Sequence, residues 1–231
     1  MSSNIKHPIE CQVLFIDLDG TLVDSVPDMA TAVNRMLVDL KFPEVAEFQV
    51  RTWVGNGLPR LVQRALWGQF DAPEEHPDLE SAVSLCRAHY TDCIHDQTQC
   101  YDGVQDSLLT LAEQGFKLVC ITNKPESLSR TLLSFLPIGN YFSLILGGDS
   151  LATRKPDPGP LFYAARHFNL DISDCLMIGD SSSDINAAKS AGCASICVSY
   201  GYNQGIDPVS LGPTVIVDHF PEILDYVVFK A

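Results

Sequence analysis

The stretch Phe15-Ile16-Asp17-Leu18-Asp19-Gly20-Thr21-Leu22-Val23-Asp24-Ser25 decides the fold. It starts at the end of an apolar run over residues 12–17, which is typical of a strand buried on both faces. Two carboxylates, Asp17 and Asp19, follow at i and i+2, and Gly20 then turns the chain away. Carboxylates this close repel each other strongly unless a cation lies between them. The stretch therefore predicts a cation site at the end of a buried strand, and the oxygen ligands favour Mg²⁺.

Further apolar and β-branched runs, each ending in a polar or Gly-rich turn, recur along the chain. They cover residues 117–122, 143–147, 174–179, 194–198 and 214–218. Helical periodicity separates or follows them at residues 104–114, 126–136, 158–169, 182–191 and 221–229. This alternation of strand and helix predicts an α/β fold with a doubly wound, mostly parallel sheet.

One long segment breaks the alternation. Between Ser25 and His95 the apolar periodicity is helical throughout, and Ser25 with Asp28 resembles a capping box. A helical segment of this length is too long for an ordinary crossover between two strands. We therefore expect an inserted α-helical cap domain. The expected units are a cap at 24–96 and a core at 1–23 and 97–231, joined by linkers near 23–24 and 96–102.

Composition restricts the class of partner. Twenty-nine acidic residues against fifteen basic ones give a formal charge of -14, which disfavours phosphate backbones and anionic lipids. Residues 1–10 lack the apolar region of a signal peptide, and no apolar run approaches the length that spans a bilayer. The eight cysteines form no Cys-x-x-Cys pattern, so we expect reduced, structural thiols. These features predict a cytoplasmic protein that binds neither nucleic acid nor membrane.

Three more motifs follow predicted strands and carry polar groups. Thr122-Asn123-Lys124 offers a hydroxyl and amides to a phosphate, and Lys155 lies in Arg154-Lys155-Pro156-Asp157-Pro158. Asp180 and Asp184 follow the run at 174–179. Each motif alone has an ordinary structural explanation, such as a turn threonine or a surface lysine. Because open α/β sheets bind ligands at the carboxyl ends of their strands, we expect these groups to converge in one crevice.

In these motifs the chain resembles the haloacid dehalogenase-like superfamily and, within it, the phosphoglycolate phosphatases. The motifs occur in the order found in that superfamily, and residues 24–96 look like its helical cap. The segment Val50-Arg51-Thr52-Trp53-Val54-Gly55-Asn56-Gly57 is similar to the part of the cap that faces the substrate in that branch. Ser182-Ser183 departs from the pattern, since relatives often carry an Arg-Asn pair there.

The resemblance implies a Mg²⁺-dependent phosphatase that hydrolyses 2-phosphoglycolate through an aspartyl-phosphate intermediate. Asp17 would attack phosphorus, and Asp19 would serve as general acid and then general base. Thr122 and Lys155 would bind the oxygens of the transferring group. The implied metal ligands are Asp17, Asp19 through its backbone carbonyl, Asp180 and Asp184. The implied substrate-binding residues are Gly20, Thr21, Asn123, Arg51, Thr52 and Asn56.

Other functions stay open from the sequence. The same chemistry could act on another small sugar phosphate or on pyrophosphate, and the same fold could transfer phosphate within a sugar. Thr21 favours hydrolysis, because the related mutases often have Val there. A phosphonate-cleaving relative would need a cap lysine near the site, and Lys41 is the one lysine between Ser25 and His95. An inactive binding protein is the alternative of a different class. The expected partner is a small anionic phosphomonoester, and the expected state is a monomer or homodimer.

Overall fold

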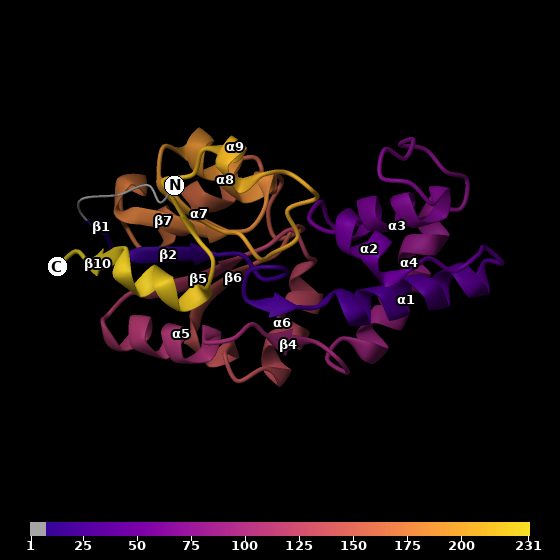
Figure 1. Cartoon of the computed structure of the whole chain (residues 1–231), viewed down its shortest axis with the longest axis horizontal. Coiled ribbons are helices and arrows are strands. Elements are labelled where there is room, and N and C mark those ends of the chain that lie inside the picture. The colour runs from indigo at the N-terminus through magenta and orange to yellow at the C-terminus, as the bar shows by residue number, and fades with distance from the viewer. Residues whose placement is uncertain (1–7) are drawn as a thin grey trace.

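A six-stranded parallel sheet forms the centre of the larger part of the molecule (Figure 1). The computed structural model describes residues 8–231, so residues 1–7 of the expected core and most of the segment searched for a signal peptide lie outside it. Along the sheet the strands are β6 (Phe142–Leu146), β5 (Lys117–Ile121), β2 (Val13–Ile16), β7 (Cys175–Gly179), β8 (Ala194–Val198) and β9 (Val215–Val217). All five pairings are parallel, so the predicted doubly wound sheet and its six strands are confirmed.

The central strand β2 shows why its sequence is continuously apolar. Val13 and Phe15 belong to the apolar cluster on one face of the sheet, whereas Leu14 and Ile16 belong to the cluster on the other. Successive side chains of a strand point to opposite faces, so burial on both faces requires apolar residues at every position.

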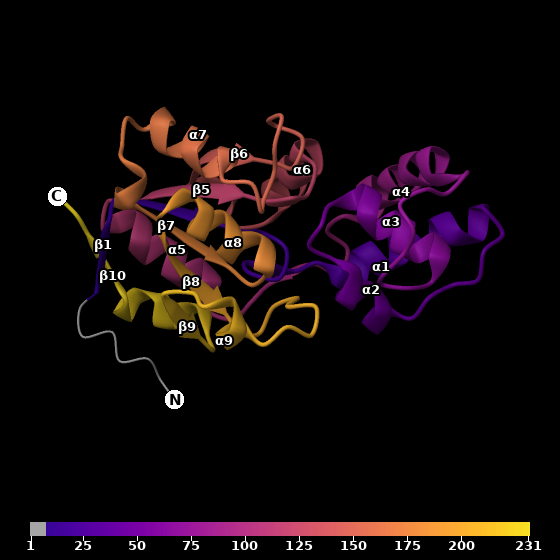
Figure 2. The ribbon, with the colours of Figure 1, turned by 90° about the horizontal axis from the view of Figure 1, so that it is seen from above.

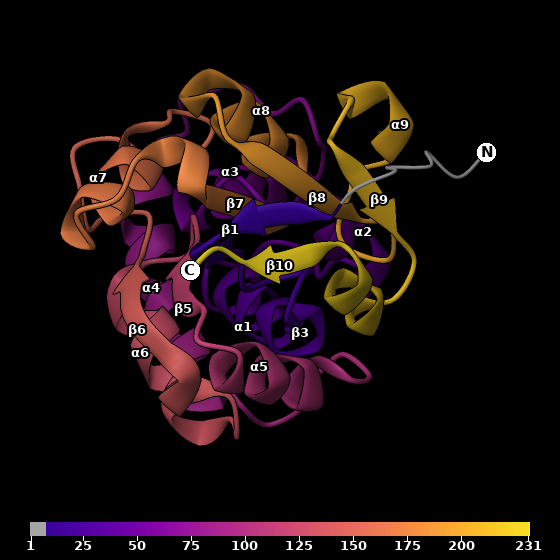
Figure 3. The ribbon, with the colours of Figure 1, turned by 90° about the vertical axis from the view of Figure 1, so that its left-hand side faces the viewer.

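Helices cover both faces of the sheet, and Figure 3 shows α7 and α8 on one side and α5 on the other. They are α5 (Val104–Glu113), α6 (Glu126–Phe135), α7 (Gly159–His167) and α8 (Ser182–Ala191). These four helices confirm the periodicity seen in the sequence. Within residues 8–231, no helix combines the length and apolar character needed to cross a bilayer.

The order of the strands creates a switch point at β2. From β2 the chain continues to β5 and β6 on one side, then returns to β7, β8 and β9 on the other. Asp17, Thr122 and Asp180 directly follow β2, β5 and β7, which are neighbours in the sheet. The topology therefore brings these three residues together at the carboxyl edge, where such sheets bind ligands.

Four inserted helices, here called the cap, lie beyond this edge (Figure 2). They are α1 (Val26–Asp39), α2 (Glu47–Trp53), α3 (Leu58–Trp67) and α4 (Leu79–Cys93). The two linkers pair with each other as a short antiparallel ribbon of β3 (Val23–Asp24) and β4 (Gln99–Cys100). The chain thus enters and leaves the cap through adjacent strands.

The predicted helix at 221–229 is wrong. The segment forms a 3₁₀ helix, Phe220–Asp225, and then a strand, β10 (Val227–Phe229), which pairs in parallel with β1 (Ile9–Cys11) (Figure 3). Val227 and Val228 are β-branched and favour extended backbone, and β1 supplies the hydrogen-bonding partner. Shorter elements complete the chain: α9 (Pro208–Leu211) and the 3₁₀ helices Gly139–Tyr141 and Ile172–Asp174.

The predicted capping box at the start of α1 is also wrong. The hydroxyl of Ser25 donates to Asp19 Oδ1 at 2.6 Å instead of capping the helix. The carboxylate of Asp28 is fully buried and accepts hydrogen bonds from the linker that returns to the core. Its donors are the Gln97 amide at 3.0 Å, the Thr98 amide at 2.8 Å and the Thr98 hydroxyl at 2.7 Å. Asp28 therefore connects the first turn of α1 to the linker through which the chain leaves the cap.

Replacing Asp28 with Ala is expected to lower the free energy of unfolding by about 3 kcal/mol, because buried amide and hydroxyl donors lose their acceptor. Urea denaturation followed by circular dichroism measures the change. The control is Asp92→Ala on the exposed side of α4, expected to change stability by less than about 0.5 kcal/mol. Equal losses in the two variants would contradict a special role for Asp28.

Candidate active site

A buried ammonium group organises the carboxyl edge of the sheet. Lys155 Nζ lies 2.9 Å from Asp17 Oδ1 and 2.6 Å from Asp184 Oδ1, and it donates to the Ile121 carbonyl at 2.5 Å. The side chain of Lys155 is only 2% exposed, so it is not the surface lysine that its sequence context alone would allow. Burial lowers the pKa of Lys155, but the carboxylates of Asp17 and Asp184 outweigh this effect and raise it above its ordinary value. The group therefore stays charged.

Three carboxylates face one another around this ammonium. Asp17, Asp180 and Asp184 are buried, and each offers an oxygen within 4.8 Å of the others. Asp180 accepts from the Thr21 hydroxyl at 3.0 Å and the Tyr202 amide at 2.5 Å. Buried Asp17 Oδ1 has no hydrogen bond of good geometry among the described residues, although Lys155 lies within ion-pair distance.

Asp184 is held by the first turn of α8. The amide and hydroxyl of Ser181 both donate to Asp184 Oδ2, at 3.1 and 2.6 Å. This arrangement leaves Asp184 Oδ1 facing Lys155 and the cluster of carboxylates.

This cluster carries more negative charge than its lysine can neutralise. Burial raises the pKa of Asp17 to about 7, opposed by Lys155 and reinforced by Asp184 and Asp19. Burial likewise raises the pKa of Asp180, and the charges of Asp184 and Asp17 add to the rise. A divalent cation with oxygen ligands would relieve this repulsion, and carboxylate oxygens are the donors that Mg²⁺ prefers. The residues present therefore fit such an ion.

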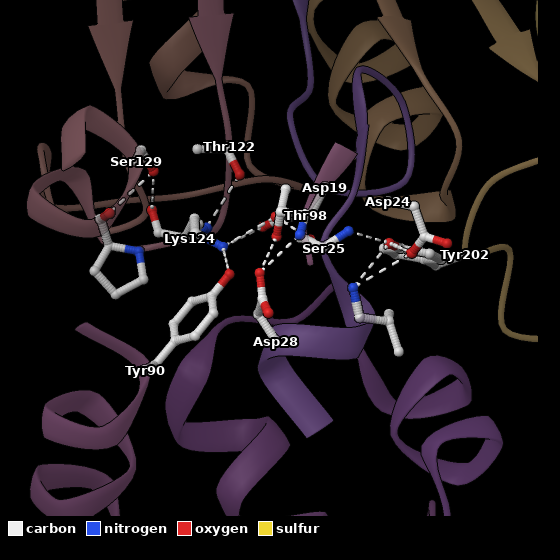
Figure 4. Close-up of polar contacts among 12 residues, drawn as sticks. Asp19, Asp24, Ser25, Asp28, Tyr90, Thr98, Thr122, Lys124, Ser129 and Tyr202 are labelled. Atoms are coloured by element: carbon white, nitrogen blue, oxygen red, sulfur yellow. Dashed lines mark hydrogen bonds and ion pairs between the residues drawn. The ribbon is translucent and has the colours of Figure 1, made fainter. Parts of the chain in front are cut away.

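The carboxylate of Asp19 has different neighbours (Figure 4). It accepts from Ser25 Oγ at 2.6 Å and from Lys124 Nζ at 3.0 Å. Lys124 Nζ also donates to the hydroxyl of Tyr90, on cap helix α4, at 2.5 Å. The structure thus places Asp19 beside a cation and a cap residue, outside the group of three carboxylates.

A pocket with about 610 Å³ of empty space, part of it open to solvent, lies between core and cap. Asp17, Asp19, Thr122, Asn123 and Lys155 all line it, as the sequence predicts. The side-chain amide of Asn123 donates to the Gly55 carbonyl of the cap and to the Lys155 carbonyl, both at 3.0 Å. Asn123 therefore holds a cap loop against the core at the rim of the pocket.

Gly20 and Thr21 lie behind the pocket rather than in its wall. Gly20 has φ of 88°, and a Cβ there would come within 2.4 Å of Asp180 Oδ2. Only glycine fits this position, because both the backbone angle and the space exclude a side chain. Thr21 is fully buried and donates to Asp180. Both residues position a carboxylate of the cluster in this structure.

The three predicted cap residues do not line the pocket either. Arg51 donates to both oxygens of Asp24 at 3.1 Å, the Thr52 hydroxyl donates to the Gln49 carbonyl, and Asn56 Oδ1 accepts from Arg64. The cap instead contributes a mainly apolar wall. Its side chains are Met29, Ala32, Val54, Leu58, Leu61, Cys86 and Tyr90.

The sequence predicts no separate role for three further residues at the site, Lys124, Tyr202 and Tyr90. Lys124 directly follows Thr122-Asn123, so its position beside the predicted phosphate-binding turn is the available signal. Tyr202 follows strand β8, another carboxyl end at the same edge, and its hydroxyl donates to Asp24 Oδ1 at 2.6 Å. Tyr90 gave no separate signal, because its position fits the apolar periodicity of α4.

The geometry agrees with comparisons to known proteins. Residues 13–198 match the family described as haloacid dehalogenase-like hydrolase. The chain belongs to this family. A phosphoglycolate phosphatase of Colwellia psychrerythraea is 45% identical over 217 residues, which cover 93% of this chain and 96% of the relative. One of Nitrosococcus oceani is 40% identical over 95% of this chain and 96% of the relative.

Solved structures share the fold of this haloacid dehalogenase-like hydrolase. A protein of Haemophilus somnus, described as a predicted phosphoglycolate phosphatase, superposes with a TM-score of 0.87 at 37% identity. The match covers 93% of this chain and 97% of that protein. CbbY of Rhodobacter sphaeroides, solved in complex with phosphate, has a TM-score of 0.76 at 20% identity and shares the fold.

Without divalent cations, the stability of this hydrolase is expected to fall as the pH rises. The pKa of Asp17 is about 7 in the folded chain and starts from 3.8, so between these values the folded state holds a proton that the unfolded state has released. The free energy of unfolding in chelator therefore decreases from about pH 4 to about pH 7. Adding Mg²⁺ should raise the unfolding midpoint more at about pH 7.5 than at about pH 5.

The Asp17→Asn variant provides the control for this experiment. It cannot titrate at this position, so its stability in chelator should depend less on pH over the same interval. Thermal unfolding followed by circular dichroism measures both proteins. A Mg²⁺ effect of the same size at both pH values would contradict the arrangement of charge described above.

Proposed function

We propose that this chain is a Mg²⁺-dependent phosphatase that hydrolyses 2-phosphoglycolate to glycolate and phosphate. One observation carries the proposal: Asp17 is buried at the edge of the sheet, in contact with Lys155 and close to two further carboxylates. An isolated cluster of this charge serves no structural purpose that a neutral one would not serve better. Phosphoryl transfer, in contrast, requires a positioned nucleophile and neutralisation of charge.

The reaction would proceed in two steps at Asp17. First, a carboxylate oxygen of Asp17 forms a bond to phosphorus while the bond from phosphorus to the ester oxygen breaks, and Asp19 gives its proton to the leaving alkoxide. Asp19 then removes a proton from water, which attacks phosphorus and releases Asp17 and phosphate. Ser25 and Lys124 hold the carboxylate of Asp19 in place for both transfers.

Asp17, Asp180 and Asp184 would hold Mg²⁺, together with the backbone carbonyl of Asp19. When bound, the ion supplies positive charge to the phosphoryl oxygens and to the nucleophile. Thr122 and Lys155 would contact the transferring oxygens from the core, and the charge of Lys155 opposes the rise that burial causes in the pKa of Asp17.

Two features favour 2-phosphoglycolate over larger phosphomonoesters. The relatives at 40–45% identity carry the name phosphoglycolate phosphatase. The apolar wall that the cap contributes would leave the hydroxyls of a sugar without hydrogen-bonding partners, which costs binding free energy. A sugar phosphate or pyrophosphate remains the second candidate, since the chemistry at Asp17 would be the same.

We also propose that the enzyme works in the cytoplasm as a monomer or homodimer on a small anionic substrate. All eight cysteines are free thiols, and six of them are buried in the fold. Burial raises the pKa of Cys86 and of Cys197 to about 12, which keeps these thiols protonated and unreactive. Such thiols suit a reducing compartment.

Phosphate release from a panel of small phosphomonoesters tests the function. We expect strong preference for 2-phosphoglycolate in Mg²⁺, no release in chelator, and a loss of at least roughly 1,000-fold in kcat for Asp17→Asn, since the nucleophile is removed. Asp157→Asn, an exposed change in the loop before α7, is the matched control and should retain activity. Equal turnover of several sugar phosphates would contradict the substrate. Undiminished activity of Asp17→Asn would contradict the mechanism.

A further inference from the structure

The pair Lys124 and Tyr90 lies at the junction of core, cap and pocket (Figure 4). Lys124 extends from the turn after β5, and Tyr90 extends from cap helix α4. The ammonium group contacts the Tyr90 oxygen at 2.5 Å and lies 4.4 Å from the centre of its ring. The side chain of Lys124 is 3% exposed, so its charge is directed at the pocket rather than at bulk solvent.

The contacts of the pair are concentrated on one carboxylate, and the Tyr90 hydroxyl keeps a hydrogen-bond donor that nothing in residues 8–231 uses. Lys124 Nζ donates to both oxygens of Asp19, at 3.0 and 3.3 Å, and to the oxygen of Tyr90, so one carboxylate takes two of its three N–H donors. Tyr90 accepts from Lys124 through its oxygen, and its own proton has no acceptor among the described residues. Burial raises the pKa of Tyr90 well above its ordinary value, so it keeps this proton. A buried cation and a free hydroxyl donor thus lie side by side in the pocket.

Their distance from the reacting atoms matches a short leaving group. If Asp19 protonates the ester oxygen, the two atoms must approach to about 2.6–3.2 Å. In a phosphomonoester whose ester oxygen is attached to CH₂–COO⁻, the carboxylate oxygens lie only roughly 3 Å from that ester oxygen. Lys124 Nζ lies 3.0 Å from the carboxylate of Asp19. A carboxylate at this place in the leaving group therefore comes within reach of Lys124.

Other cations are poorly placed for this task. Among the described residues that line the pocket, Lys155 is the one further cationic side chain, and two carboxylates and a carbonyl already surround it. Arg51 is engaged by Asp24 and Glu47 outside the pocket. The remaining cap wall is apolar. Among the described residues that line the pocket, Lys124 is therefore the cation best placed to pair with a second negative charge on the substrate.

We propose that Lys124, assisted by the hydroxyl of Tyr90, binds the carboxylate of the substrate and so selects phosphomonoesters with a carboxylate one carbon from the ester oxygen. This inference rests on the proposed function and adds the residue that determines specificity. The residue that recognises the substrate is then a lysine of the core and not Arg51 of the cap, which the sequence resemblance implies as a substrate-binding residue.

A pair of substrates that differ in the carboxylate tests the proposal. Wild type, Lys124→Met and Lys124→Arg are compared on 2-phosphoglycolate and on 2-hydroxyethyl phosphate, which has CH₂OH in place of the carboxylate. Lys124→Met should lose roughly 10- to 100-fold in kcat/KM on 2-phosphoglycolate, mainly through KM, because a charge-assisted hydrogen bond is removed. The ratio of kcat/KM on 2-phosphoglycolate to kcat/KM on 2-hydroxyethyl phosphate should fall by at least roughly fivefold, because 2-hydroxyethyl phosphate loses only the positioning of Asp19 and no contact of its own. Lys124→Arg, which keeps the charge, should retain most of the preference.

The control is Lys117→Met, an exposed lysine at the opposite end of β5, which should behave as wild type on both substrates. Circular dichroism establishes that each variant is folded, and Lys124→Gln serves as a second neutral variant. Equal losses on both substrates would overturn the inference, since Lys124 would then act only by positioning Asp19. A preference retained in Lys124→Met and Lys124→Gln would also overturn it, while the proposed function would stand. Wild type without any preference for 2-phosphoglycolate would overturn both.

Discussion

The ion contacts of one buried lysine govern the carboxyl edge of this molecule. Lys155 is enclosed by Asp17, Asp184 and the Ile121 carbonyl. Removing these charges from water costs more free energy than a surface ion pair could return, and a third carboxylate, Asp180, increases the repulsion. The surrounding chain therefore supplies hydrogen bonds from Thr21, Ser181 and the Tyr202 amide to hold the carboxylates in place. An arrangement this unfavourable without a divalent cation is one that binding of such a cation stabilises.

The same edge is where the cap meets the core. Asn123 donates to the cap at Gly55, and Lys124 contacts Tyr90 of α4. On the linker side, burial alone would raise the pKa of Asp24, but hydrogen bonds from Arg51 and Tyr202 lower it below its ordinary value. Groups next to the carboxylates of the pocket thus take part in holding the cap over it. Covering part of the pocket in this way limits the access of water, which strengthens the electrostatic interactions inside it.

Most of the architecture follows from local sequence. The continuously apolar run Val13–Ile16 is typical of a strand that is buried on both faces of a sheet. Parallel sheets bind ligands at the carboxyl ends of their strands, and this rule predicts that Asp17, Thr122 and Asp180 lie together. Predictions from local sequence are wrong where a segment distant in the chain determines the secondary structure. The segment 221–229 forms a strand because β1 is available to pair with it, over 200 residues earlier in the chain.

The cap side of the site shows the same limit. Arg51 has the charge expected of a substrate-binding residue, but Asp24 and Glu47 both engage it. In the sequence, Tyr90 fits the apolar periodicity of α4. Only the folded chain shows that its hydroxyl accepts a hydrogen bond from Lys124 beside Asp19. Which side chains of the inserted helices reach the pocket depends on how these helices pack against the core. The apolar periodicity of either segment does not contain that information.

The central claim is that Asp17 is the group to which phosphorus is transferred, and trapping the phosphorylated enzyme tests it most directly. The enzyme is mixed with 2-phosphoglycolate and Mg²⁺, quenched within the first turnover and treated with borohydride, which reduces an acyl phosphate to the alcohol. Peptide mass spectrometry should then find homoserine at position 17, and none when substrate or Mg²⁺ is omitted. Homoserine at position 19, or at no aspartate while phosphate is being released, would contradict the account.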